Sequence, residues 1–425
     1  METVIIFGCL LLLLLTGLPV FISLSVISIG ALLFTGQNLS IVPLSMYSST
    51  ENFVLLAVPL FLLMANIMTQ GGVGDDLFDF VHTWLKHLPG GLAMTTVVTC
   101  AVFAAICGSS AATAATIGIA AIPPMLRYKY EKPFVLGLVA AGGTLGILIP
   151  PSGPMIIYGA VTNTSVGKLF MAGIIPGLVI TALFLVYCWF FALRRPELQA
   201  ENPAPWGDRW KAFKRAALSL VMPPVIIGGI YLGIFTPTEA AAIGAIMSFI
   251  ICFLIYRRLG SKDLIPIFKQ TIKTTTMIFM IIGAAILFGQ VLTINQVPQK
   301  IVNLAIELQL EKWMFLLFVN VLLLFLGCFL EVVSTILIVV PIFFPIVERL
   351  GIDPVWFGVI FTINMELALI TPPVGMNLYV AMGVGESSLK EVLNGVWPFL
   401  LLLVTGLIII MLMPDLSLWL ANLIG

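Results

Sequence analysis

Long apolar runs, separated by short polar segments, occupy most of this chain, and two of the runs have an unusual length. The first, Leu92–Leu126, contains no Asp, Glu, Lys or Arg, and the second, Trp313–Val347, contains only Glu331. One helix needs about 20 apolar residues to cross a bilayer, so each run is too long for one crossing and too short for two. Each run therefore predicts a re-entrant helical hairpin, which enters and leaves the membrane on the same side around a non-helical tip.

Two further runs, Pro133–Thr162 and Pro354–Met382, are interrupted by double prolines. The interruptions read GILIPPSGP, residues 146–154, and ALITPPVGMN, residues 368–377. Proline lacks an amide donor and disfavours helix at the residue before it, so each pair frees carbonyl oxygens of the preceding turn. We therefore predict a broken transmembrane helix in each run.

The other apolar runs predict ordinary membrane helices, with one amphipathic helix on the membrane surface. The first two runs form a short helix pair, and the amphipathic segment is Asp75–His87. The predicted elements are Val4–Gly17, Pro19–Phe34, Phe53–Thr69, Asp75–His87, Lys168–Leu193, Ala216–Ile234, Thr238–Tyr256, Met277–Val291 and Val392–Leu412.

The two halves of the chain resemble each other. Pro345 follows Pro124 by 221 positions (345 − 124). Six later pairs of identical residues are separated by either 221 or 222 positions. The matched pairs are Pro124/Pro345, Pro133/Pro354, Gly137/Gly358, Pro150/Pro372, Pro151/Pro373, Gly153/Gly375 and Tyr158/Tyr379. The prediction is a first repeat over residues 1–193 with hairpin 92–126 and broken helix 133–162. A linker over 194–215 follows, and then a second repeat over 216–425 with hairpin 313–347 and broken helix 354–382.

Loop charges indicate that the repeats have opposite orientations. The loop after the first hairpin carries Arg127, Lys129 and Lys132 against Glu131, whereas its counterpart has Arg349 against Glu348 and Asp353. Positive loops stay in the cytoplasm, as does the basic linker Arg194–Arg215. Counting crossings from these loops gives an inverted-topology repeat with both chain termini in the periplasm.

Composition agrees with this architecture. The chain is 60% hydrophobic and 9% charged, with a mean hydropathy of +1.14, whereas soluble domains carry about 25% charged residues. We predict an all-α polytopic membrane protein. The formal net charge is zero, which gives no basis for nucleic-acid binding. No nucleophile–base arrangement or metal-binding spacing occurs, so we do not expect an enzyme.

The hairpin tips and helix breaks carry the candidate chemistry. The tips read CGSSAAT, residues 107–113, and GCFLEVVST, residues 327–335. Hydroxyls and freed carbonyls are suitable ligands for a hard cation, and half-helix N-termini favour an anion. Glu331 and Glu366 are acids within apolar runs and are expected to face a cavity or partner, whereas Glu239 is expected to cap a helix.

Four stretches resemble the large membrane subunit of tripartite ATP-independent periplasmic (TRAP) transporters, the DctM/SiaM type. They are CGSSAATAATIGIAAIPPM, GGTLGILIPPSGPMIIYG, FTPTEAAAIGA and ITPPVGMNLYV. The resemblance implies an elevator-type secondary transporter in the bacterial inner membrane, driven by a Na⁺ gradient. It also implies a separate small four-helix membrane subunit and a periplasmic substrate-binding protein. Family substrates are organic acids, chiefly C4-dicarboxylates and sialic acid (N-acetylneuraminate), and the likeness is nearest to the sialic acid members.

The resemblance also implies site residues, with about two Na⁺ ions bound at unwound helix segments. One Na⁺ site would use Ser109, Ser110 and Thr113, with backbone near Gly143, Gly146 and Pro150. The second would use Gly327, Ser334 and Thr335, with backbone near Ala368 and Thr371. Substrate would lie between the tips and contact Ser110, Ser152 and Asn377, with Glu331 and Glu366 as supporting acids.

Other functions remain open on the sequence. A stand-alone ion-coupled dicarboxylate symporter or an ion antiporter would share the inverted hairpins and would need no binding protein. A channel would conduct without saturation or Na⁺ coupling.

Overall fold

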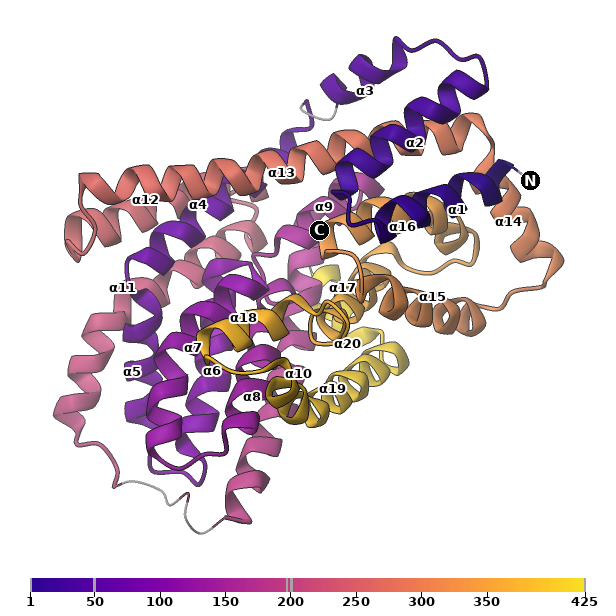
Figure 1. Ribbon diagram of the computed structural model, residues 1–425. Helices are drawn as coiled ribbons and strands as arrows, with labels where there is room; N and C mark the ends of the chain where they lie inside the picture. Colours follow the sequence, from indigo (N-terminus) through magenta and orange to yellow (C-terminus); the bar gives the residue numbers. More distant parts are fainter. Residues whose placement is uncertain (1, 49–50, 196–197, 199–201, 424–425) are drawn as a thin grey trace.

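The computed structural model describes residues 2–48, 51–195, 198 and 202–423, and these residues contain helices and no strand. Seven of the described helices are long and apolar enough to cross a membrane. The all-α prediction is therefore confirmed for the described part of the chain. Figure 1 shows the helices packed side by side in one body, with α1, α2 and α3 along one edge.

Helical hairpins occur at both unusually long apolar runs. The first consists of α6 (Gly91–Cys107) and α7 (Ser110–Arg127), and the second of α15 (Lys312–Gly327) and α16 (Val332–Arg349). The first tip turns at Gly108, whose φ of 64° is left-handed and suits glycine. The second tip spans residues 328–331, where Cys328 follows α15 in helical geometry and Glu331 precedes α16 in extended geometry.

Helix breaks occur at both double prolines. In the first half, α8 (Lys132–Thr144) passes through the 3₁₀ turn η2 (Leu145–Ile147) before α9 (Gly153–Thr162) begins. In the second half, residues 370–375 separate α17 (Pro354–Leu369) from α18 (Met376–Val384). Both Pro–Pro bonds are cis.

The order of elements around these features occurs twice. A membrane-length helix and a short helix precede each hairpin, and a long helix follows each broken helix. In the first half they are α4 (Ala57–Gln70, preceded by the 3₁₀ turn η1, Phe53–Leu56), α5 (Val73–Leu85) and α10 (Val166–Leu193). In the second half they are α13 (Ser261–Ile294), α14 (Val297–Glu307) and α19 (Leu389–Leu412). The remaining helices are α1 (Glu2–Leu15), α2 (Val20–Phe34), α3 (Ile41–Ser48), α11 (Trp206–Tyr231), α12 (Pro237–Phe249, continued by a π-helical stretch, Ile250–Ile255) and α20 (Asp415–Asn422).

Several elements differ from the sequence-based expectation. The last part of the predicted linker 194–215 is helical, because α11 begins at Trp206. Residues 196, 197 and 199–201 of that linker lie outside the described residues. Helix α13 begins at Ser261 rather than Met277. Both extensions are rich in Lys, which suggests a loop by polarity although Lys is a good helix former. Helices α3, α14 and α20 were not predicted, since each is too short to give a membrane signal. The predicted cap is confirmed: Glu239 and Thr236 form a capping box at the start of α12.

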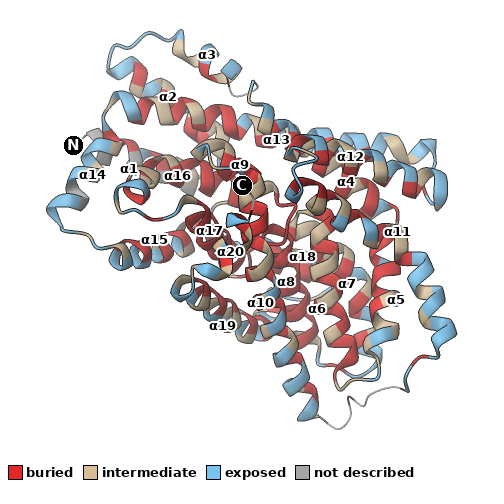
Figure 2. Ribbon diagram, turned by 180° about the vertical axis from the view of Figure 1, so that it is seen from behind, coloured by how far each residue is buried: buried red, intermediate tan, exposed pale blue. Residues whose placement is uncertain are grey.

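The hairpins and broken helices form the most buried part of the molecule. Figure 2 shows buried residues concentrated in α6, α8, α16 and α17, whereas α3 and the start of α11 are largely exposed. The packing of α8 against α19 is especially close. A Cβ atom at Gly395 would lie 1.7 Å from the Pro133 carbonyl oxygen, and one at Gly137 would lie 2.2 Å from the Gly395 carbonyl oxygen. Backbones approach this closely only where side chains are absent.

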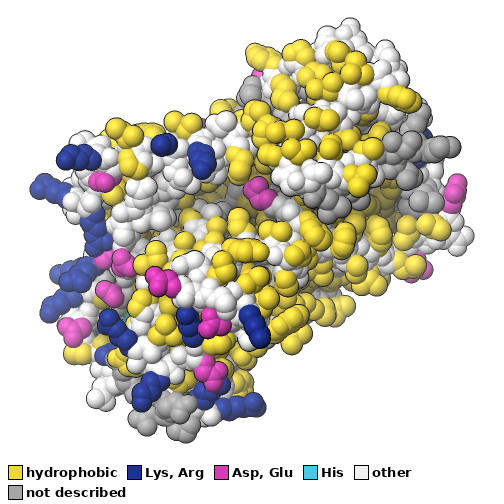
Figure 3. Space-filling model, in the orientation of Figure 1, with side chains coloured by type: hydrophobic (Ala, Val, Ile, Leu, Met, Phe, Trp, Pro, Cys, Tyr) yellow, Lys and Arg dark blue, Asp and Glu magenta, His cyan; other side chains and the backbone are white. Residues whose placement is uncertain are grey.

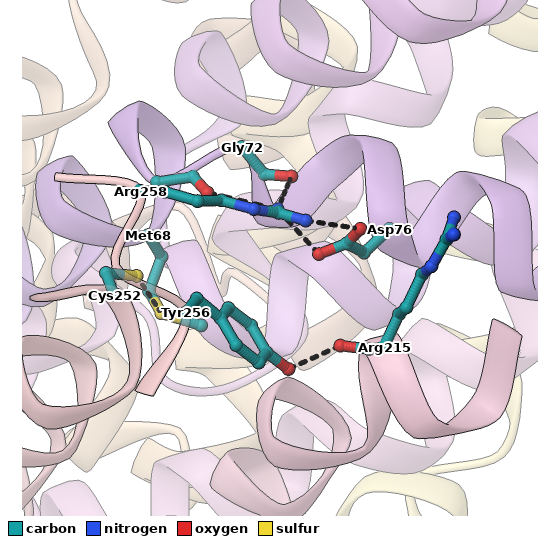
Figure 4. Close-up of polar contacts among 8 residues, drawn as sticks. Met68, Gly72, Asp76, Arg215, Cys252, Tyr256 and Arg258 are labelled. Atoms are coloured by element: carbon teal, nitrogen blue, oxygen red, sulfur yellow. Dashed lines mark hydrogen bonds and ion pairs between the residues drawn. The ribbon is translucent and has the colours of Figure 1, made fainter. Parts of the chain in front are cut away.

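An ion pair joins α5 to the segment after α12. Arg258 Nη1 lies 2.6 Å from Asp76 Oδ2, and Arg258 Nη2 donates to Asp76 Oδ1 at 2.9 Å. Arg258 Nη1 also donates to the carbonyl oxygen of Gly72, at 3.1 Å, beyond the end of α4 (Figure 4). The hydrogen bond to Asp76 raises the pKa of Arg258 above its usual value. This one side chain therefore joins three segments, α4, α5 and the residues after α12.

Replacement of Gly395 by alanine should destabilise the protein by about 1–3 kcal/mol, because the new methyl group overlaps the backbone at Pro133. The melting temperature in detergent should fall. Gly289→Ala in α13 is the matched control, since a Cβ there meets nothing within 4 Å. An unchanged melting temperature for Gly395→Ala would contradict the close packing of α8 and α19.

Candidate functional site

The first hairpin tip lies directly against the first helix break. A Cβ at Gly108 would lie 2.4 Å from the Pro151 carbonyl oxygen, and one at Gly146 would lie 2.6 Å from the Ser109 carbonyl oxygen. Farther along the same contact, a Cβ at Gly143 would lie 2.5 Å from the Ala114 Cβ. The structure thus brings together the tip and the break that the sequence predicted as one Na⁺ site.

Backbone oxygens and one hydroxyl gather at this contact. Ser109 is in extended geometry, with φ −137° and ψ 125°, so α7 begins only at Ser110. The Thr113 hydroxyl donates to the Ser109 carbonyl oxygen at 2.8 Å, and a Cβ at Gly146 would lie 2.9 Å from that hydroxyl oxygen. Oxygen atoms of Ser109 and Thr113 therefore lie close to the Gly146 backbone.

A hydrogen-bond chain joins the first hairpin to the second broken helix. The Ser110 hydroxyl donates to Asn377 Oδ1 at 3.1 Å, and Asn377 Nδ2 donates to the Ala140 carbonyl oxygen at 3.0 Å. Ser110 and Asn377 are both buried. Helix α18 accordingly packs on α7 and α8. Two of the predicted substrate residues, Ser110 and Asn377, are in direct contact.

Ser152, the third predicted substrate residue, lies at the start of α9 with its side chain buried. Its hydroxyl donates to the Ile147 carbonyl oxygen at 2.5 Å and accepts from the Met155 amide at 3.4 Å. In this arrangement the hydroxyl caps α9 and satisfies a carbonyl freed by the double proline.

The second tip and second break repeat the contact with different residues. A Cβ at Gly327 would lie 2.4 Å from the Ala368 Cβ, and the Val374 amide donates to the Cys328 carbonyl oxygen at 3.1 Å. The Thr335 hydroxyl donates to the Glu331 carbonyl oxygen at 3.0 Å, and the Thr371 hydroxyl donates to Leu367 at 2.6 Å. Ser334 is fully buried, and its hydroxyl has no hydrogen-bond partner among the described residues. The residues predicted for the second Na⁺ site therefore also cluster around one tip and one break.

The two predicted acids differ in environment. Glu366 in α17 is fully buried, neither carboxylate oxygen has a hydrogen-bond partner in the described part of the chain, and Thr144 is close to it. Glu331 is half-buried at the second tip, where it precedes α16. A buried carboxylate is costly unless a proton, a cation or donors balance its charge. Of the two acids, Glu366 is therefore the one whose carboxylate most needs a proton, a cation or hydrogen-bond donors to balance its charge.

Sequence reasoning missed some polar contributors to this region. Asn364 Nδ2 donates to Asn320 Oδ1 at 2.6 Å, which joins α17 to α15 next to Glu366 along the chain. The carbonyl of Ala140 and the hydroxyl of Thr144 were missed as well. The two asparagines could have been found as isolated amides inside apolar runs, whereas nothing in the local sequence singles out the Ala140 carbonyl.

The arrangement favours small hard cations and anions over transition metals. Within the described residues, no group of three or more His, Cys, Asp or Glu side chains could hold a metal ion. The polar atoms at the tips and breaks are hydroxyl and carbonyl oxygens, which are ligands for hard cations. Helices α7, α9, α16 and α18 all begin at these tips and breaks, so their N-terminal amides and dipoles favour an anion.

Comparison with known proteins agrees with the sequence resemblance. A family model described as "Tripartite ATP-independent periplasmic transporter, DctM component" matches residues 7–416. The chain is 40% identical to "C4-dicarboxylate TRAP transporter large permease protein DctM" of Rhodobacter capsulatus, with 100% of each chain covered. It is 44% identical to the protein of the same name in Pseudomonas aeruginosa, covering 93% of this chain and 92% of the relative.

Two more distant likenesses extend this comparison. The chain is 36% identical to "Sialic acid TRAP transporter large permease protein SiaM" of Vibrio cholerae, over 97% of this chain and 96% of the relative. Its fold is similar to that of the Alcanivorax borkumensis YdaH transporter, with a TM-score of 0.54, 15% identity and 86% of each chain covered. The family model and the full-length relatives together show that this chain belongs to the TRAP transporter family as a DctM component, the large permease.

Proposed function

We propose that this large permease carries an organic acid across the bacterial inner membrane together with Na⁺ ions. Substrate would be delivered by a periplasmic binding protein, and a separate small four-helix membrane subunit would complete the complex. The single observation that carries the proposal is the contact between hairpin tip and helix break, which occurs once in each half of the chain. Such contacts place freed backbone oxygens and helix N-termini together, as ion-coupled carriers require.

Two Na⁺ ions are proposed, one for each tip and break. The first would take oxygen ligands from Ser109, Ser110 and Thr113 and from backbone near Gly143, Gly146 and Pro150. The second would use Gly327, Ser334 and Thr335 with backbone near Ala368 and Thr371. The Ser334 hydroxyl supports the second site: it has no hydrogen-bond partner among the described residues, and a buried hydroxyl left unpaired is costly.

The substrate would lie near the Ser110–Asn377 contact, with Ser152 at the adjacent start of α9. The tips and breaks contain no Lys or Arg, so helix N-termini, hydroxyls, the Asn377 amide and bound Na⁺ would hold the carboxylates. Between the two expected substrate classes, C4-dicarboxylates are favoured. The relatives named for these acids reach 44% and 40% identity, against 36% for the relative named for sialic acid.

Movement is proposed to be elevator-like, with both hairpins and both broken helices travelling as one unit. Their dense mutual packing supports this, since α7, α8 and α18 pack together and α9 packs on α16. The twofold order of elements and the loop charges support an inverted-topology repeat with both termini in the periplasm. The alternative is a stand-alone symporter or antiporter of the same geometry, which would work without a binding protein.

Uptake into proteoliposomes that contain this chain and its small membrane partner tests the function. We expect succinate-type dicarboxylate uptake only when an inward Na⁺ gradient and the cognate binding protein are both present. Uptake that persists without the binding protein would support the stand-alone symporter. Uptake that is equally fast when K⁺ replaces Na⁺ would refute Na⁺ coupling.

Gly146→Ala should raise the Na⁺ concentration for half-maximal uptake by about tenfold or more, because the added methyl group overlaps the Ser109 carbonyl and the Thr113 hydroxyl. Gly153→Ala is the matched control in the same break, where a Cβ meets nothing within 4 Å. Its half-saturating Na⁺ concentration should stay within about twofold of the wild-type value. Equal Na⁺ requirements for both variants would remove Gly146 from the site.

Asn377→Ala should lower uptake at saturating Na⁺ by roughly tenfold, since it removes both hydrogen bonds that join α18 to α7 and α8. Thr405→Ala is the control, because the exposed Thr405 hydroxyl bonds only to Leu401 in its own helix. Normal uptake by a correctly inserted Asn377→Ala protein would show that the Ser110–Asn377 contact has no part in transport.

A further inference from the structure

A row of aromatic side chains crosses from α5 to α11 outside the hairpins and broken helices. The ring centroids follow one another from Trp206 to Trp84 at 6.0 Å, then to Phe80 at 6.3 Å, to Phe213 at 6.0 Å and to Trp210 at 5.3 Å. We call these five residues the aromatic ladder. Two helices from different halves of the chain thus present one continuous aromatic surface.

The ladder is exposed where a soluble protein would bury it. Trp206 is 74% exposed and Trp210 is 58% exposed. On α11 the ladder residues are Trp206, Trp210 and Phe213, a spacing that places them on one helix face. The same helix continues into an apolar segment that is long enough to cross a membrane. The ladder therefore lies at the polar end of a membrane-length helix.

Two cations, Arg209 and Lys214, flank the ladder. The Arg209 guanidinium lies 5.0 Å from the Trp84 ring centroid and 5.3 Å from that of Trp206, and Lys214 Nζ lies 5.6 Å from the Trp210 ring. Neither cation forms an ion pair within the described residues. Among the described residues, the ladder is therefore flanked by two cations that have no ion-pair partner.

The cations on the other side of α11 have acidic neighbours. Lys211 pairs with Asp208 at 3.8 Å. Burial, followed by the charges of Asp76 and Asp75, raises the pKa of Asp79 on α5, and the charge of Arg215 opposes this rise, so Arg215 has an acidic neighbour. Figure 3 shows Lys and Arg gathered at the end of the molecule where α5, α11 and the start of α13 lie. Asp and Glu side chains lie among these cations in the same view (Figure 3). Arg209 and Lys214 differ from Lys211 and Arg215 in lying against the aromatic rings.

We propose that the aromatic ladder, with Arg209 and Lys214, binds the headgroups of anionic phospholipids in the cytoplasmic leaflet. Tryptophan rings favour the level of the headgroups, and each Lys or Arg near an anionic leaflet adds to the attraction. A lipid satisfies both observations, because its phosphate meets the cations while its glycerol and upper acyl region cover the exposed rings. A small soluble anion would leave Trp206 and Trp210 in water. The interaction would hold α5, the helix that leads into the first hairpin, at a fixed depth.

The test measures binding of a fluorescent phosphatidylglycerol to the detergent-solubilised protein. Arg209→Gln combined with Lys214→Gln should weaken binding by about tenfold to thirtyfold, from the loss of two interfacial cations. The matched control is Lys211→Gln combined with Arg215→Gln, which removes the same charge from the other face of the same helix. We expect the control to weaken binding by less than about threefold. Melting temperatures of both variants establish that they are folded.

Three further arms on the wild-type protein remove the dependence on any variant. Fluorescent phosphatidylcholine should bind at least about tenfold more weakly than phosphatidylglycerol. Glycerophosphoglycerol, which has the headgroup without acyl chains, should not compete, and neither should poly-glutamate.

Equal weakening by the two double variants would refute a role for the aromatic face. Competition by glycerophosphoglycerol would indicate a free-anion site, and competition by poly-glutamate would indicate an acidic protein partner. Each of these outcomes would overturn the proposal without bearing on Na⁺-coupled uptake.

Discussion

Close approach of backbone to backbone between hairpin tips and helix breaks is the constraint on which the rest of the molecule depends. Gly108, Gly143 and Gly146 permit it in the first half, and Gly327 opposite Ala368 permits it in the second. Any larger side chain at Gly146 would occupy the space of the Ser109 carbonyl. Since non-helical backbone inside a bilayer must be enclosed by protein or line a cavity, this packing is what makes the interruptions tolerable.

Polar groups released by the interruptions are mostly satisfied locally. The Ser152 hydroxyl caps α9 and donates to the Ile147 carbonyl oxygen, while the hydroxyls of Thr113, Thr335 and Thr371 donate to carbonyl oxygens one turn earlier. The exceptions are more informative than the rule. The Ser334 hydroxyl and the Glu366 carboxylate are buried without a hydrogen bond of normal geometry in the described chain. Ser334 lies in the second hairpin, where the proposed second Na⁺ would use its oxygen, and Glu366 lies close to Thr144 at the first break.

The two halves are also tied together across the sequence. Asn377 of α18 joins Ser110 of the first hairpin to Ala140 of the first broken helix, and Tyr158 of α9 donates to the Pro354 carbonyl at the start of α17. These bonds support movement of hairpins and broken helices as one unit. Away from that unit, Arg258 ties α4, α5 and the end of α12 together, and the aromatic ladder extends the same contact to α11. Helix α5 therefore stands between the packed unit and the surrounding helices.

By itself, the sequence determined the elements whose signal is local. Run length located both hairpins within two residues at each end, and double prolines located both breaks, because proline chemistry acts on the adjacent turn. The repeated motifs were enough to indicate the family. The starts of α11 and α13 were predicted too late in the chain from local polarity. A lysine-rich segment can form either a loop or a helix, and its packing against other elements decides which.

Only the tertiary structure decided which polar groups meet. The contact of Ser110 with Asn377 spans 267 residues, and the use of Ser152 as a helix cap depends on the position of the Ile147 carbonyl. The complete burial of Glu366, with Thr144 close to its carboxylate, likewise depends on the elements packed around α17 rather than on α17 alone. Every residue has a backbone carbonyl, so the residue type does not reveal which carbonyl, such as that of Ala140, takes part in a site. Only the three-dimensional geometry decides this.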